Sequence, residues 1–136
     1  MPAADVLLIE DEQMDRELVQ ELVALKGRGR VRITEAPDLE AGLTLLRARS
    51  FDLVLLDTRL PDASALSALR AVGDAAPDTP ILAHPTFVTV QMRRAARERG
   101  PWDVAGRGEL DPMWAAMTNL LAIEKEELGG VHRRSA

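Results

Sequence analysis

Two unbroken apolar runs, each of which stops on carboxylates, constrain the fold of this chain most strongly. Residues 53–56 read Leu-Val-Leu-Leu and are followed by Asp57, and residues 6–9 read Val-Leu-Leu-Ile and are followed by Glu10, Asp11 and Glu12. Four apolar residues are too few for a globular helix, and a run without polar residues is typical of a strand buried on both faces. The sequence therefore predicts two central strands that carry carboxylates at their carboxyl ends.

Amphipathic stretches follow each predicted strand. Apolar residues recur at intervals of four, four and three after the first strand, which predicts a core-facing helical stripe of Met14, Leu18, Leu22 and Leu25. Asp38 is placed to cap the second helix. The core-facing residues expected on the later helices are Leu39, Leu43 and Leu46, then Leu66, Leu69 and Val72, then Val88, Met92 and Ala95, and finally Met113, Met117, Leu120 and Leu121.

Turn formers and caps place the helix boundaries. The third helix is expected to start near Ala63 or Ser64, and the fourth to span about residues 87–99. Pro112 is expected to open the last helix, because proline is favoured in a first turn. That helix is expected to run through an acidic end and to break at the glycine pair 129–130.

The chain alternates strand and helix five times, which specifies an α/β fold with a parallel sheet and right-handed crossovers. Val31 and Ile33 alternate with polar residues, and the last strand, 104–105, is short, so both of these strands are expected at the sheet edges. The result is a flavodoxin-like (βα)5 doubly wound sheet of order 2-1-3-4-5. In that order Glu10, Asp11 and Asp57 converge in one crevice.

Bulk composition narrows the class of protein. The 136 residues fit one domain, expected over residues 1–126 with 127–136 as a C-terminal tail. The chain has no cysteine, which excludes disulfides and thiolate metal sites, and its net charge of −5 argues against binding nucleic acid. Its apolar runs are too short for a membrane span and it shows no signal-peptide pattern, so a cytoplasmic location is expected.

Three carboxylates in one crevice repel one another, and at least one would take up a proton unless a cation neutralised them. Oxygen donors select Mg²⁺ or Mn²⁺. With the cation bound, Asp57 would be ionised and nucleophilic. The alternative interpretation is that these acids only cap helices or solvate loops.

The motifs 6-VLLIEDE-12 and 51-FDLVLLDTRLP-61 together resemble the receiver domain of two-component response regulators. The resemblance covers about residues 4–126 and is to the stand-alone, chemotaxis-regulator-like members. It implies that Asp57 accepts a phosphoryl group from a sensor histidine kinase or a phosphotransfer protein. It also implies that Asp11 binds Mg²⁺ directly, Glu10 binds it through water, and the backbone carbonyl of Arg59 completes the ligands.

The same resemblance implies signalling by contact with a downstream protein target. It implies no enzymatic activity beyond self-phosphorylation and dephosphorylation at Asp57, and no organic cofactor. A haloacid-dehalogenase-type phosphatase would also place a nucleophilic aspartate after a buried strand. That class needs a second aspartate two residues later, where this chain has Arg59.

The chain departs from the receiver pattern around the phosphorylation site. Counting five residues from Pro80 places Pro85 where receivers have a switch serine or threonine, and Thr86 could substitute only if the loop shifts. Arg107 stands where receivers have lysine, 22 residues after Pro85, and Val104 stands at the aromatic switch position. His84, next to Pro85 in a strand, is expected to point away from the site.

Two functional hypotheses follow from these departures. In the first, Asp57 is phosphorylated and the signal is transmitted without the usual switch residues, for example by Arg107 binding the phosphate. In the second, the chain is a degenerate pseudo-receiver that binds a protein partner without phosphorylation. A metal site built from His84 and His132 has little support, because one residue adjoins a proline and the other lies in the tail.

Opposite charges are expected on the face formed by the fourth helix, fifth strand and fifth helix, which receivers commonly use for dimers or targets. The fourth helix supplies Arg93, Arg94 and Arg97, and the end of the fifth supplies Glu124, Glu126 and Glu127. Such a face suits a two-fold homodimer, although a solvated basic helix is an equally good interpretation. Trp102 is either a partner anchor on this face or ordinary packing at the sheet edge.

Overall fold

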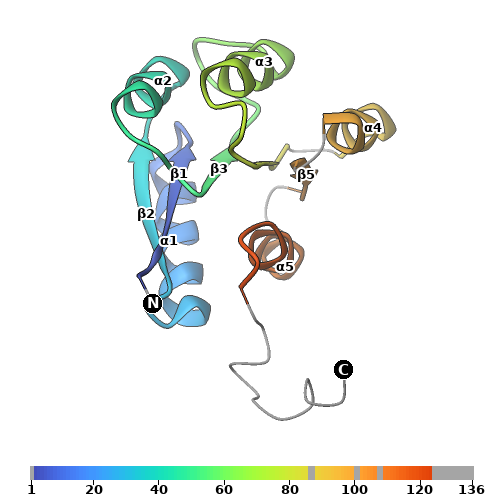
Figure 1. Ribbon diagram of the computed structural model, residues 1–136. Helices are drawn as coiled ribbons and strands as arrows, with labels where there is room; N and C mark the ends of the chain where they lie inside the picture. The colour runs from blue at the N-terminus through green and yellow to red at the C-terminus, as the bar shows by residue number, and fades with distance from the viewer. Residues whose placement is uncertain (1, 86–87, 100–101, 107–108, 124–136) are drawn as a thin grey trace.

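The computed structural model describes residues 2–85, 88–99, 102–106 and 109–123. Its centre is one parallel sheet in the order β2-β1-β3-β4-β5, as the sequence predicts (Figure 1). The strands are β1 (Ala4–Ile9), β2 (Val31–Ala36), β3 (Leu53–Leu56), β4 (Ile81–Ala83) and β5 (Trp102–Val104). The central strands β1 and β3 are those with unbroken apolar runs, and each of their eight residues 6–9 and 53–56 is fully buried.

Helices cover both faces of the sheet (Figure 1). Two of them, α1 (Gln13–Gly27) and α5 (Leu110–Leu120), pack on one face, while α2 (Leu39–Ala48) and α3 (Ala65–Ala75) pack on the other. The remaining helix, α4 (Val90–Arg99), lies beside β5. None of the helices in the described part of the chain is both long enough and apolar enough to span a bilayer.

The core-facing side of α1 differs from the prediction. Met14 and Leu25 are 81% and 79% exposed, and Leu18 is also exposed. Leu22 is buried as predicted, and Val19 and Val23 are buried with it. Apolar residues lie on both sides of this helix, so spacing alone fits either stripe, and the side with Val19, Leu22 and Val23 is the one that joins the core. One consequence is an exposed apolar stripe that begins three residues after Asp11.

Several predicted boundaries also shift. In α3, Leu66 is 63% exposed and Ala68 packs with Val72 instead. The fourth helix begins at Val90 rather than near residue 87, β5 ends rather than begins at Val104, and α5 begins at Leu110, which places Pro112 third in its first turn. The predicted cap Asp38 is confirmed, because its side chain accepts a hydrogen bond from the Ala41 N–H. The third helix begins at Ala65, close to the expected start, and Ser64 caps it by accepting a hydrogen bond from the Ser67 N–H.

The last helix ends earlier than expected, at Leu120. Ala122 adopts a left-handed backbone with φ of 57° and donates its N–H to the Asn119 carbonyl, while the Ile123 N–H reaches the Thr118 carbonyl. This pair of bonds is a Schellman motif, and Ile123 packs against the core next to it. The motif normally uses glycine at the left-handed position, so its formation on an alanine left no signal in the sequence.

A second carboxylate caps α2 from another part of the chain. Asp62, in the loop after β3, accepts hydrogen bonds from the N–H groups of Leu39 and Glu40, both at 3.1 Å. Burial of the Asp62 carboxyl raises its pKa, but these N–H groups favour the ionised form more strongly, so the pKa lies below the ordinary 3.8. This contact joins the loop that follows Asp57 to the second helix.

Replacing Asp62 by alanine is therefore expected to lower the free energy of unfolding at neutral pH by up to about 1 kcal/mol, as loss of an exposed helix cap does. Because the folded-state pKa is depressed, the stabilisation is present above the unfolded pKa and is lost as the pH falls through the folded one. The difference between Asp62→Ala and wild type should thus shrink below about pH 4 in urea unfolding. An undiminished difference in acid would contradict the capping role.

Candidate functional site

The carboxyl ends of β1 and β3 bring two of the predicted acids side by side. Ile9 pairs with Leu56 in the parallel ladder, so Glu10 and Asp57 are the next residues along each strand. The Asp57 N–H donates to the Ile9 carbonyl at 2.9 Å, and the Glu10 N–H donates to the Ala36 carbonyl at 3.0 Å. Both acids are therefore held by the sheet itself, and both are fully buried.

Asp11 joins them from the loop that leads into α1. Oxygen atoms of Glu10, Asp11 and Asp57 all lie within 4.8 Å of one another, and Asp11 is the exposed member of the cluster. The convergence expected from the strand order is thus present. Three carboxylate oxygens at this spacing, with one side open to solvent, form a donor set that suits a hard divalent cation such as Mg²⁺ or Mn²⁺.

The loop after Asp57 folds back on the carboxylate. The Arg59 N–H donates to Asp57 Oδ1 at 2.9 Å, while the Arg59 side chain is exposed. Leu60 is buried and forms an isolated antiparallel bridge with Ala63, which fixes the turn around Pro61. The same turn that satisfies Asp57 therefore sets the position of the Arg59 backbone, whose carbonyl is the expected fourth ligand.

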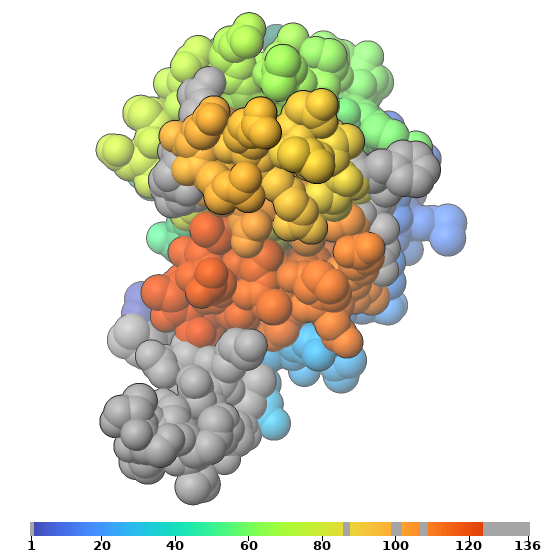
Figure 2. Space-filling view, turned by 90° about the vertical axis from the view of Figure 1, so that its right-hand side faces the viewer, coloured from blue at the N-terminus to red at the C-terminus, as the bar shows by residue number. Residues whose placement is uncertain are grey.

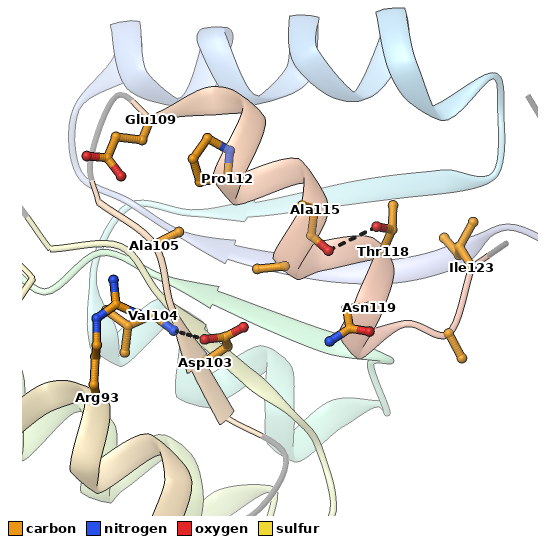
Figure 3. Close-up of a pocket in the computed structure, with 12 residues that line it drawn as sticks. Arg93, Asp103, Val104, Ala105, Glu109, Pro112, Ala115, Thr118, Asn119 and Ile123 are labelled. Atoms are coloured by element: carbon orange, nitrogen blue, oxygen red, sulfur yellow. Dashed lines mark hydrogen bonds between the residues drawn. The ribbon is translucent and has the colours of Figure 1, made fainter. Parts of the chain in front are cut away.

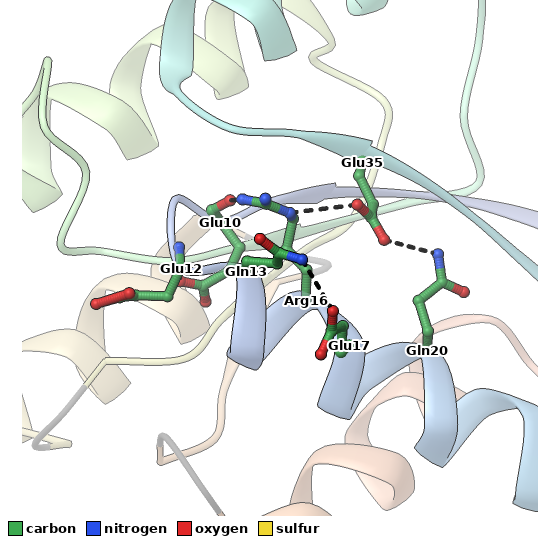
Figure 4. A network of polar contacts seen from close by, with 7 residues as sticks. All are labelled: Glu10, Glu12, Gln13, Arg16, Glu17, Gln20 and Glu35. Atoms are coloured by element: carbon green, nitrogen blue, oxygen red, sulfur yellow. Dashed lines mark hydrogen bonds and ion pairs between the residues drawn. The ribbon is translucent and has the colours of Figure 1, made fainter.

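A polar network holds Glu10 and the start of α1 together (Figure 4). The Glu12 N–H donates to Glu10 Oε2 at 3.2 Å, and Arg16 Nη1 donates to the Glu10 backbone carbonyl at 2.7 Å. Arg16 Nε also pairs with Glu35 at 3.2 Å, and Gln20 donates to the same carboxylate. Sequence reasoning missed Arg16 and Glu35, because they come from α1 and β2 and no spacing signal links them.

His84 points toward the site, so the expectation that it points away is wrong. The β3–β4 ladder pairs Leu56 with Ala83. The next residues along these two strands, Asp57 and His84, therefore lie side by side. The His84 N–H donates to the Leu56 carbonyl at 3.0 Å. Its side chain is only 3% exposed, and its Nε2 lies 3.7 Å from Glu10 Oε1. The register between β3 and β4 decides this orientation, and it could not be read from β4 alone.

The remaining predicted positions are only partly described. Pro85 is buried directly after His84 and offers no hydroxyl. Val104 is buried at the end of β5, where the receiver pattern has an aromatic residue. Trp102 is partly buried and packs against the core next to Gly73, which favours the packing interpretation. The expected phosphate-reading residues Thr86 and Arg107 lie outside the described residues.

A family model described as the response regulator receiver domain matches residues 6–105, a segment that contains the three acids and His84. The chain belongs to this family. Receiver domains interact with histidine kinases or phosphotransfer proteins, bind Mg²⁺ at an acidic site, and are generally signalling modules rather than enzymes. This chain has an acidic cluster, formed by Glu10, Asp11 and Asp57.

Known proteins agree with this assignment. The transcriptional regulatory protein DltR of Streptococcus agalactiae is 40% identical over 95 residues, which cover 70% of this chain and 39% of DltR. The chain thus spans well under half the length of that relative. The receiver domain of the sensor histidine kinase PA1611 of Pseudomonas aeruginosa, solved with a magnesium ion in its active site cleft, has a TM-score of 0.73 at 19% identity, covering 88% of this chain and 98% of that one.

The chemotaxis protein CheY4 of Vibrio cholerae also has a TM-score of 0.73, at 18% identity, covering 87% of this chain and 98% of CheY4. At such low identity these two structures show the shared fold, and the five-stranded flavodoxin-like topology of this receiver domain matches theirs.

Proposed function

We propose that this receiver domain, assigned to residues 1–126 with 127–136 as a tail, works as part of an atypical response regulator that accepts a phosphoryl group on Asp57. The observation that carries the proposal is the buried carboxylate of Asp57 within 4.8 Å of Glu10 and Asp11 at the strand ends. The donor is a sensor histidine kinase or a phosphotransfer protein, and the output passes through protein contact in the cytoplasm.

The nucleophile of the proposed transfer is the Asp57 carboxylate. One carboxylate oxygen forms a bond to phosphorus as the bond from phosphorus to the donor's imidazole nitrogen breaks, and that electron pair stays on the imidazole. With acetyl phosphate as donor, the broken bond is phosphorus–oxygen and acetate leaves. The Arg59 N–H already donates to Asp57 Oδ1, which fixes the orientation of the carboxylate.

The residues that would hold a divalent cation are Asp11 directly, Glu10 through water, Asp57, and the Arg59 backbone carbonyl. When bound, the cation supplies positive charge that offsets the repulsion between the carboxylates and the incoming phosphoryl oxygens. The exposed stripe on α1 supports docking of a protein donor beside the site, because Met14 follows Asp11 by three residues and offers apolar surface there.

Beryllofluoride, a phosphoryl mimic, tests whether the site is formed as proposed. We expect a bound fluorine resonance in ¹⁹F NMR when Mg²⁺ is present and none when EDTA replaces it. Binding that is independent of Mg²⁺ would contradict the role given to the three acids. No binding in either condition would favour the alternative function below.

A degenerate pseudo-receiver, which binds a protein partner without phosphorylation, is the second candidate. It is favoured by Pro85, which has neither a hydroxyl nor an N–H to contact an acyl phosphate, and by Val104, which is buried and lacks an aromatic ring. These residues affect transmission of the signal and leave the acceptor intact. For this reason the phosphorylated regulator remains the preferred proposal.

The face formed by α4, β5 and α5 is the proposed docking surface (Figure 2). An open groove of about 700 Å³ runs between these elements (Figure 3). Arg93 of α4, Asp103 of β5 and Glu109 before α5 line it with charged side chains. Arg94 and Arg97 are exposed on the same helix, while the acidic residues expected at 124–127 lie outside the described residues.

Opposite charges across one groove support a two-fold homodimer in which each copy's arginines meet the other's carboxylates. We expect sedimentation equilibrium to show a dimer that weakens as salt rises, because exposed charge pairs are screened. Arg94→Glu with Arg97→Glu should shift the protein to monomer, whereas Arg70→Glu on α3 should not. A monomer at high protein concentration in low salt would overturn the dimer.

A further inference from the structure

His84 is a buried polar side chain at the site to which the proposed transfer chemistry gives no role. It lies in register with Asp57 at the end of β4, and its imidazole faces the Glu10 carboxylate at 3.7 Å. We propose that His84 is a positioning residue that fixes the Glu10 carboxylate in the orientation required for divalent cation binding. This inference rests on the proposed function, because it concerns the cation of the same site.

The two carboxylate oxygens of Glu10 face different elements of the fold. Oε2 accepts a hydrogen bond from the Glu12 N–H in the loop after β1, and Oε1 faces His84 Nε2 from β4. Arg16 holds the backbone carbonyl of the same residue. These contacts, on both carboxylate oxygens and on the main chain, restrict rotation of the carboxylate about its terminal bond.

Restriction matters here because Glu10 is fully buried beside two other carboxylates. Repulsion from Asp11 and Asp57 would otherwise turn its charged end away from the cluster. The His84 imidazole lies 3.7 Å from Oε1 and opposes this rotation, so that Glu10 stays oriented toward a water molecule bound to the cation. The cluster of ligand atoms that lie within 4.8 Å of one another comprises Glu10, Asp11 and Asp57 and does not include His84. We therefore treat His84 as a neighbour of the ligands and not as a ligand.

Partners that orient metal-binding carboxylates usually contribute 10–100-fold to metal affinity. We therefore expect His84→Val, which replaces the imidazole by a branched apolar side chain, to weaken Mg²⁺ binding at least about tenfold in isothermal titration calorimetry. His84→Gln, whose amide can reach the same oxygen, should recover most of the wild-type affinity. Thermal unfolding of each variant without metal shows whether packing alone has changed.

A double-mutant cycle isolates the contact. In a Glu10→Gln background, His84→Val should cause little further loss of Mg²⁺ affinity, because the group it positions is gone. Equal affinity of wild type and His84→Val would overturn the inference while leaving the cation site intact. If wild type itself binds no Mg²⁺, the proposed function fails, and the inference fails with it.

Should His84→Val not fold, the wild-type imidazole can be observed directly. The chain has two histidines, so His132→Gln leaves His84 as the single source of imidazole ¹⁵N signals. We expect its Nε2 resonance to shift on addition of Mg²⁺ and to stop responding in Glu10→Gln. An Nε2 chemical shift that does not change on addition of Mg²⁺ would overturn the positioning role. Pulsed EPR with Mn²⁺ that detects a directly bound nitrogen would also overturn it, in favour of ligation.

Discussion

Replacing Asp57 by asparagine is expected to reduce phosphoryl incorporation from acetyl phosphate to background. Asparagine has the same size as aspartate, but its neutral amide is not a nucleophile and cannot form the acyl phosphate. Asp57 is fully buried at the end of β3, so the substitution keeps the packing and removes one of three mutually repelling charges. The folded variant should therefore be at least as stable as wild type while its intact mass stays unchanged.

The matched control for this variant is Asp38→Asn. Asp38 caps α2 on the α2–α3 side of the sheet, and asparagine is as good a helix cap as aspartate. This control should incorporate a phosphoryl group at the wild-type rate. Incorporation that persists in a folded Asp57→Asn would contradict the assignment of the acceptor, whatever the control does.

Replacing Leu55 by alanine is expected to cause a large loss of stability. Leu55 lies in the middle of β3, is fully buried, and packs between β1, β4 and the helices α1 and α5. Truncating such a residue usually costs about 2–5 kcal/mol, because transfer free energy is lost and a cavity remains. Urea unfolding of the two proteins measures this difference.

Leu66 provides the same chemical change at an exposed position. It was expected in the core of α3, but it is 63% exposed, so Leu66→Ala should change the free energy of unfolding by no more than about 0.5 kcal/mol. A loss at Leu66 that equals the loss at Leu55 would mean that the helix presents its predicted stripe to the sheet after all.

The sheet order and the acid cluster were predictable because they depend on the strands alone. Unbroken apolar runs identify β1 and β3 as buried on both faces, and five alternating repeats leave few topologies. Once these two strands are neighbours, Glu10 and Asp57 must lie side by side at their ends. The sequence carries this information locally, in the residues that flank each run.

The features that escaped prediction depend on contacts between elements. Met14 and Val19 are both apolar residues of α1, and only packing against the sheet decides which of them is buried. The orientation of His84 follows from the register of β3 and β4, and the links from Arg16 to Glu10 and Glu35 join three segments. None of these relations leaves a periodic pattern in a single segment of the chain.

The most direct test of the central claim is the intact mass of the wild-type protein after incubation with acetyl phosphate, with Mg²⁺ or with EDTA. The account predicts the added mass of one phosphoryl group that requires Mg²⁺ and maps to the peptide containing Asp57. No added mass under conditions where the protein is folded and binds Mg²⁺ would contradict it. That result would identify the chain as a receiver fold that acts without phosphorylation.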